Sequence, residues 1–363
     1  MLPLGARSMS GVMSAAVLVA PRQMVIQELP IPEPEAGWVR VKTQAAGICG
    51  SDMHIYTGNH PWLAPGSSME KYVLGNVYGH EVAGVVDALG DSVTSLAKGD
   101  RVAVDAIVPC LRCEYCRVGQ YQICPNLGHY GLQHPGGFAE YLLVPAQNAY
   151  KLPDSLSFED GALLDVLVVG IHAVQRAGVT LADTVAVLGA GPIGLAIAAA
   201  ARRAGARATA ITTRHPLHRR LAERIGVNHI VSPDRLGRAV TDATGGRGFD
   251  VVIEAVGYEA TAIQQALDVV RQGGRIVFTG VYETPVTLDF GKLLGKEASI
   301  SASHAFGLWG LVPEFELAVE MMERGEFPAS ELVTHRFPLV GINEAFHVKL
   351  DNPSEAAKVQ IVF

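Results

Sequence analysis

The spacing of hydrophobic and polar positions changes near residue 165 of this chain. Up to about residue 150, short apolar runs are separated by turn signals such as Gly90-Asp91 and Gly99-Asp100. Apolar runs of this length between such turns predict β-strands. The predicted strands of this part are 15–20, 38–44, 82–89, 101–104 and 139–144. The first part of the chain is therefore predicted to be antiparallel and barrel-like.

From Ser157 onward the apolar spacing becomes that of helices. Ser157, with Asp160 three residues later, is typical of a capping box and predicts a helix that continues to about residue 177. Strands and helices then alternate, which indicates right-handed crossovers in a parallel sheet. The predicted strands are 185–188, 209–212, 250–253, 275–280 and 299–303, and the predicted helices are 193–203, 217–225 and 261–270.

The final segment returns to mixed character. It has a predicted helix over 312–324 and strands near Phe337 and over 358–362. Because this tail resembles the first part, the α/β unit is predicted to be inserted into the other domain. The length of 363 residues agrees with two domains, since single cores rarely grow beyond about 250–300 residues.

A glycine-rich loop follows the predicted strand 185–188. Its sequence is Gly189-Ala190-Gly191-Pro192-Ile193-Gly194. The pattern alone is weak, but a preceding strand and a following helix are the context that dinucleotide binding requires. Gly189 is expected to form the turn, Gly191 to admit a pyrophosphate, and Gly194 to pack the helix on the strand. Pro192 and Ile193 begin that helix, whose free N–H groups would bind the phosphates.

The residues that distinguish NAD from NADP lie about 20 positions beyond this loop. An NAD site usually carries an acidic residue there, whereas this chain has Thr213 and Arg214. A hydroxyl and a guanidinium bind a 2′-phosphate, which a carboxylate would repel. The sequence therefore favours NADP over NAD. The alternative is that Arg214 is a surface residue or stacks on the adenine.

Four of the five cysteines lie within fifteen residues: Cys110, Cys113, Cys116 and Cys124. Four thiolates at this spacing predict a closed, structural zinc site. An odd number of crowded cysteines is a poor disulfide framework, and in a reducing compartment such a cluster more often holds a metal. A cytoplasmic location is the default expectation. An iron–sulfur cluster is the less favoured alternative.

Composition excludes two classes of partner. A net charge of −7 with 18% charged residues argues against a nucleic-acid-binding protein. The sequence contains no run of about 18 consecutive apolar residues, so no membrane-spanning helix is predicted.

Two further motifs contain potential metal ligands. The fifth cysteine begins Cys49-Gly50-Ser51-Asp52, and 31 residues after it comes Gly79-His80-Glu81, with glycines at 84 and 90. Singly, Cys49 and His80 are more often core residues. Together with the cysteine cluster and the glycine loop, in this order, they resemble the zinc-containing alcohol dehydrogenases of the medium-chain dehydrogenase/reductase superfamily. The resemblance covers about 13–363.

That resemblance implies an α/β fold, with a GroES-like, mostly-β catalytic domain and an inserted Rossmann domain with a doubly wound parallel sheet. The implied division is 13–165 for the first part of the catalytic domain, 166–306 for the Rossmann domain and 307–363 for the return segment. Two zinc ions per chain are expected, one catalytic and one structural. Homodimers or homotetramers are common in this family.

The resemblance also assigns roles to residues. Cys49 and His80 should ligate the catalytic zinc, and Asp165 matches the third ligand position. Glu81 would be a fourth ligand or a carboxylate that orients the site. Ser51 matches the hydroxyl that relays a proton, and His54 the histidine that carries it outward. His60, His129, His134 and His304 lie in no motif. By analogy His304 and Trp309 come near the substrate cleft, but they are given no site role.

The expected reaction is zinc-dependent hydride transfer between a nicotinamide cofactor and a secondary alcohol or polyol, or the corresponding ketone. One alternative is a quinone or enone reductase without catalytic zinc, against which Cys49, His80 and Asp165 together speak. The other is a non-enzymatic cofactor-binding protein, which should have lost one of these positions. No motif names the alcohol.

Overall fold

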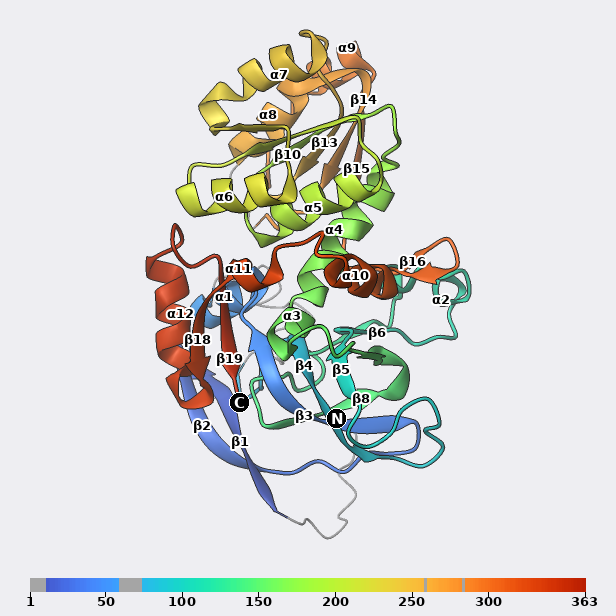
Figure 1. Ribbon diagram of the computed structural model, residues 1–363, viewed down its shortest axis with the longest axis vertical. Helices are drawn as coiled ribbons and strands as arrows, with labels where there is room; N and C mark the ends of the chain where they lie inside the picture. The colour runs from blue at the N-terminus through green and yellow to red at the C-terminus, as the bar shows by residue number, and fades with distance from the viewer. Residues whose placement is uncertain (1–10, 59–73, 258–259, 283–284) are drawn as a thin grey trace.

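Two large sheets organise the part of the chain that the computed structural model describes, residues 11–58, 74–257, 260–282 and 285–363. Figure 1 shows a parallel sheet flanked by helices above a mostly antiparallel sheet, with α4 (Leu164–Ala177) running from one to the other. The described residues therefore form an α/β unit on a mostly-β unit, as the sequence predicts.

The upper sheet is parallel throughout and has the order β12-β11-β10-β13-β14-β15. Its strands are β10 (Thr184–Leu188), β11 (Ala208–Thr212), β12 (His229–Val231), β13 (Phe249–Glu254), β14 (Val270–Phe278) and β15 (Ser299–Ala302). The helices around it are α5 (Pro192–Arg203), α6 (Pro216–Ile225), α7 (Leu236–Thr244), α8 (Ala260–Val269) and α9 (Phe290–Lys296). The strand order reverses between β10 and β13, and dinucleotides bind at such a switch point. The doubly wound sheet is confirmed.

The lower sheet combines strands from both ends of the chain. Its order is β18-β19-β3-β4-β5-β9, and β8 also pairs with β3. Its strands are β3 (Trp38–Gly47), β4 (Glu81–Leu89), β5 (Arg101–Val104), β8 (Tyr141–Pro145), β9 (Ala149–Lys151), β18 (Val333–Pro338) and β19 (Lys358–Val362). The C-terminal strand β19 thus lies directly beside β3, which ends two residues before Cys49.

Short elements complete the described chain. The strand pairs are β1 (Val12–Ala20) with β2 (Gln23–Pro30), β6 (Ile107–Val108) with β7 (Gly128–His129), and β16 (Leu308–Trp309) with β17 (Val312–Pro313). The remaining helices are α1 (Gly50–Thr57), α2 (Glu114–Arg117), α3 (Phe158–Ala162), α10 (Glu314–Glu323), α11 (Ala329–Leu332) and α12 (Ile342–Asp351). The numbered divisions 13–165, 166–306 and 307–363 stay a prediction.

Three predicted elements differ from the structure. The helix predicted from Ser157 to about residue 177 is two helices, α3 and α4, because the Leu163 N–H bonds the Asp160 carbonyl three residues back. The predicted capping box at its start is present: Ser157 Oγ accepts a hydrogen bond from the Asp160 N–H at 3.0 Å. The helix predicted from 312 begins at Glu314, since Val312 and Pro313 form β17. The strand predicted over 275–280 begins at Val270 and ends at Phe278.

A buried pair holds α4 against α10. His172 Nδ1 lies 2.9 Å from Glu314 Oε2, and the Gly307 N–H donates to the same oxygen at 2.7 Å. Both side chains are buried. This contact fixes the face of α4 that carries Asp165 two turns earlier. Among the described residues, no helix is long and apolar enough to cross a membrane.

Candidate functional site

The four clustered cysteines come together as the sequence predicts. All are free thiols, and their Sγ atoms lie within 4.8 Å of one another. The Cys113 and Cys124 sulfurs are 3.8 Å apart, far beyond a disulfide bond of about 2.05 Å. Sulfurs placed tetrahedrally about 2.3 Å from one zinc ion stand about 3.8 Å apart. The donor set and spacing therefore fit a structural zinc.

Local electrostatics also fit a cation at this cluster. Backbone N–H groups of Arg112 and Cys113 lower the pKa of the Cys110 thiol to about 6. Burial and hydrogen bonds to neighbouring thiols raise the pKa of Cys116 to about 12. A cation would be needed for all four to be thiolates together.

A second group of potential ligands forms where β3 ends and β4 begins. Cys49, His80 and Glu81 offer ligand atoms that lie within 4.8 Å of one another. Cys49 is the N-cap of α1, and His80 directly precedes β4. Because β3 and β4 pair antiparallel, with Gly47 opposite Glu81, the end of one strand meets the start of the other. The strand register thus joins two motifs that are 31 residues apart in sequence.

Asp52 supports this group and was missed in the sequence reasoning. Its carboxylate accepts the Cys49 N–H at 2.8 Å and lies 3.6 Å from His80 Nδ1. Burial opposes a charge on His80, but Asp52 and Cys49 raise its pKa well above the usual value. Such a carboxylate orients a ligating imidazole and fixes its tautomer. An acidic residue three positions after an N-cap was the available signal.

Glu81 has a buried cationic partner, Lys358, for which the sequence contains no local signal. Lys358 Nζ lies 2.5 and 2.8 Å from the two Glu81 carboxylate oxygens, and both side chains are almost fully buried. Burial opposes the charge of Lys358, but Glu81 and Cys49 raise its pKa. Lys358 begins β19, which pairs with β3 on the side away from β4. The ion pair therefore spans β3.

Asp165 lies near the group but outside its 4.8 Å cluster. It is in the first turn of α4 and is buried, and its Oδ1 has no hydrogen-bond partner among the described residues. Burial raises its pKa to about 7, while His80 lowers it and Glu81 raises it. A buried, unsatisfied carboxylate is costly unless it gains a partner. A metal ion held with Cys49 and His80 would supply one, so these residues fit a catalytic zinc.

The two residues assigned to a proton relay lie on α1. Ser51 and His54 are three residues apart on this helix and so share a face. Both are half-buried. Their position directly after Cys49 puts them at the edge of the candidate metal site.

The glycine loop has the geometry that dinucleotide binding requires. Gly189 has φ of 95°, in the left-handed region. A side chain at Gly194 would meet the Gly189 carbonyl oxygen at 1.8 Å, whereas a side chain at Gly191 would meet nothing within 4 Å. Gly191 is the N-cap of α5, and Pro192 and Ile193 begin it. The loop is thus closed toward the protein and open toward a ligand.

Thr213 and Arg214 follow β11, the neighbour of β10 in the sheet. Thr213 is buried and its Oγ1 accepts the His215 N–H at 3.1 Å, while Arg214 is exposed. The hydroxyl of Ser232 lowers the pKa of Asp234, and Arg214 contributes to this from nearby. Asp234 is therefore near enough to Arg214 to interact with it electrostatically.

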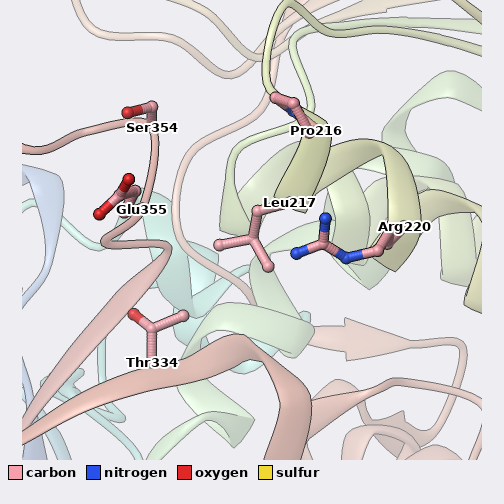
Figure 2. Close-up of a pocket in the computed structure, with 6 residues that line it drawn as sticks. All are labelled: Pro216, Leu217, Arg220, Thr334, Ser354 and Glu355. Carbon is pink, nitrogen blue, oxygen red and sulfur yellow. The ribbon is translucent and has the colours of Figure 1, made fainter.

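A cavity of about 500 Å³ separates the two units next to this loop. Figure 2 shows Arg220 and Leu217 of α6 facing Thr334 and Glu355 of the lower unit. Since α6 begins two residues after Arg214, the cavity adjoins the proposed ribose end of a dinucleotide. Together, a dinucleotide loop and a buried Cys-His-carboxylate group define a metal-dependent, nucleotide-linked oxidoreductase.

Comparison with known proteins agrees with this class. Residues 35–154 match the family "Alcohol dehydrogenase GroES-like domain", and residues 192–324 match "Zinc-binding dehydrogenase". The chain is 34% identical to sorbitol dehydrogenase of Bacillus subtilis over 360 residues, which cover 96% of this chain and 97% of that one. The chain thus belongs to the zinc-containing alcohol dehydrogenases of the medium-chain dehydrogenase/reductase superfamily, and it is an oxidoreductase.

Two solved structures are similar over nearly the whole chain. An Escherichia coli alcohol dehydrogenase in complex with NADH is 30% identical, with 98% of this chain and 100% of that chain covered and a TM-score of 0.86. A putative zinc-binding dehydrogenase from Sinorhizobium meliloti bound to NADP is 30% identical, with the same coverage and a TM-score of 0.85.

Replacing Lys358 by Met should destabilise the protein, because it leaves the buried Glu81 carboxylate without its partner. The expected loss is about 3–5 kcal/mol in the free energy of unfolding. The double variant Glu81→Gln/Lys358→Met should recover part of this loss. Denaturant unfolding of the three proteins measures both effects. The control is Lys42→Met on the exposed face of β3, expected to change stability by less than about 0.5 kcal/mol. Equal stability of Lys358→Met and Lys42→Met would contradict the importance of the pair.

Proposed function

We propose that this enzyme transfers a hydride between NADP(H) and a secondary alcohol or polyol, or the corresponding ketone. The observation that carries the proposal is that ligand atoms of Cys49, His80 and Glu81 lie within 4.8 Å of one another. The buried Asp165 carboxylate, whose Oδ1 has no hydrogen-bond partner among the described residues, supports it as a further ligand. A donor set of one thiolate, one imidazole and one carboxylate leaves a tetrahedral zinc one open position.

Cys49, His80 and Asp165 would hold this zinc, which as a Lewis acid would make an alcohol easier to deprotonate. Asp52 would fix the orientation of His80 from the side away from the metal. Glu81 is bound through both oxygens to Lys358. Its proposed role is therefore to place a negative charge beside the metal. The Glu81 carboxylate would ligate the metal only after its ion pair with Lys358 breaks.

Ser51 would take the proton of the alcohol, and His54 would pass it outward. Both lie on α1, whose first residue follows Cys49. A hydroxyl and an imidazole on one helical face suit a short proton path, because histidine titrates near neutral pH.

NADP is the proposed cofactor, with NAD as the alternative. Thr213 and Arg214 support this choice, because they directly follow β11, where an NAD enzyme usually has an acidic residue. Solved relatives carry NADH in one case and NADP in the other, so the fold accepts both. Relatives act on sorbitol, on erythritol or threitol, and on galactitol 1-phosphate by their names, which supports a polyol substrate. The unpaired cysteines support a reducing, cytoplasmic location.

Association into homodimers or homotetramers is also proposed. β15 is the edge strand of the parallel sheet and offers unpaired backbone groups. Beside it in sequence, Phe290 and Leu294 of α9 are exposed by 72% and 79%. An edge strand next to exposed apolar side chains supports sheet extension across a two-fold axis.

The proposed reaction is tested with secondary alcohols, polyols and their ketones, each with NAD and with NADP. The wild type should turn over at least one polyol, with a higher kcat/KM for NADP. Arg214→Ala should lower kcat/KM for NADP about ten- to a hundredfold and leave NAD little changed, because a charge-assisted phosphate contact is lost. Arg219→Ala, an exposed arginine on α6, is the control. Unchanged use of NADP by Arg214→Ala would refute the cofactor preference, and inactivity on every substrate would refute the reaction.

The proposed oligomer is tested by light scattering after gel filtration. The wild type should elute at two or four times the chain mass of 38.5 kDa. Leu294→Glu should shift it toward the monomer, since it puts a charge into an apolar interface. The matched control is Leu311→Glu, an exposed leucine near β16. A monomeric wild type would refute the proposal.

A further inference from the structure

His129 lies beside the candidate zinc ligand His80 and belongs to no motif. The centroids of the two rings are 5.0 Å apart and the rings are inclined by 70°. His129 is outside the group whose ligand atoms lie within 4.8 Å and, unlike Asp165, it matches no ligand position of the zinc-containing family, so it is not assigned to the metal. Its side chain is half-buried and thus partly accessible. An imidazole 5.0 Å from the His80 ring is near enough to reach a group bound on that side of His80.

A hydrogen bond sets which nitrogen of this ring carries the proton. His129 Nδ1 lies 2.5 Å from the carbonyl oxygen of Tyr130, and a carbonyl oxygen can only accept. Nδ1 is therefore the N–H donor, and Nε2 of the neutral ring keeps its lone pair. Among the described residues, the ring hydrogen bonds to Tyr130 alone. Nε2 is left as an acceptor for a ligand.

The backbone around His129 is held firmly. In β7 it pairs with Ile107 of β6, and its carbonyl accepts the N–H groups of Leu132 and His134. Cys124 of the structural zinc site lies five residues before it. A ring held in this way is a specific contact rather than a mobile one.

A second imidazole reaches the same region from the other unit. His304 follows β15 and is close enough to His129 to act on it electrostatically. His129 and His304 thus come near each other from two segments far apart in sequence. A substrate with a further hydroxyl group suits this position, because an apolar chain against His129 would leave its Nε2 unsatisfied.

We propose that His129 Nε2 accepts a hydrogen bond from a hydroxyl on the carbon next to the one that is oxidised. His129 is then a specificity-determining residue that selects vicinal diols and longer polyols over simple secondary alcohols. This inference rests on the proposed function, since it assumes that an alcohol is oxidised beside His80.

The test compares butane-2,3-diol with butan-2-ol, which differ in one hydroxyl group. The measured quantity is the ratio of kcat/KM for the diol to kcat/KM for the mono-alcohol. His129→Leu should lower this ratio about three- to tenfold, the effect of one hydrogen bond, mainly through KM for the diol. His129→Gln, whose amide oxygen can accept a hydrogen bond, should restore part of it. His134→Leu, on the same segment but packed against Trp38 and Tyr130, should leave the ratio unchanged.

An unchanged ratio in His129→Leu would overturn the inference while leaving the proposed reaction intact. Equal losses on both alcohols in His129→Leu and His129→Gln would also overturn it, because they would assign the ring to support of His80. A wild type that oxidises neither these nor any other alcohol would overturn the proposed function and this inference with it.

Discussion

The ion pair between Glu81 and Lys358 depends on the position of one strand, and so does the rest of the site. β3 lies between β4 and β19, so the start of β4 and the C-terminal strand meet on either side of the residues that lead to Cys49. Gly47 stands opposite both Glu81 and Gln360. Because the pair is buried, each charge needs the other. The C-terminal strand therefore supports the candidate metal site through Lys358.

The second constraint is the contact between the two units. α4 carries Asp165 in its first turn, near the candidate metal ligands, and continues upward toward the parallel sheet. Two turns further on, Glu314 of α10 fixes His172. The glycine loop belongs to the same unit as this sheet and is open at Gly191, where a side chain would meet nothing within 4 Å. In the proposed reaction, one helix thus sets the distance between a carboxylate at the metal and the sheet that holds the cofactor. The cluster of four cysteines is also connected to this region, because five residues after Cys124 the chain reaches His129, whose ring lies beside that of His80.

Local signals predicted much of this arrangement. The alternation of strands and helices predicted the parallel sheet, and the glycine spacing predicted a loop whose first glycine has a positive φ and whose third leaves no room for a side chain. The four cysteines are close enough in sequence that their spacing alone predicted their cluster. Cys49 and His80 required the resemblance to a family, because residues 31 positions apart give no local signal of contact.

Other features of the fold and the candidate site depend on contacts between residues far apart in sequence, which no local sequence pattern predicts. From the sequence, Lys358 is predicted only as the first residue of a strand, because its partner Glu81 lies 277 positions earlier. The break between α3 and α4 at Leu163 falls inside an unbroken apolar helical pattern. Asp52 was in view as part of a motif, but its contact with His80 depends on the pairing of β3 with β4. His129 gained meaning only when the fold put it beside His80.

Zinc analysis tests the central claim most directly. Metal content and the zinc X-ray absorption edge would be measured on the wild type, Cys49→Ala and Cys116→Ala. The wild type should hold two zinc ions per chain, one with four sulfur ligands at about 2.3 Å and one with a single sulfur among nitrogen and oxygen ligands. Cys49→Ala should keep only the all-sulfur site, and Cys116→Ala should lose that site. A wild type with one zinc, bound by four sulfurs and unaffected by Cys49→Ala, would contradict the account.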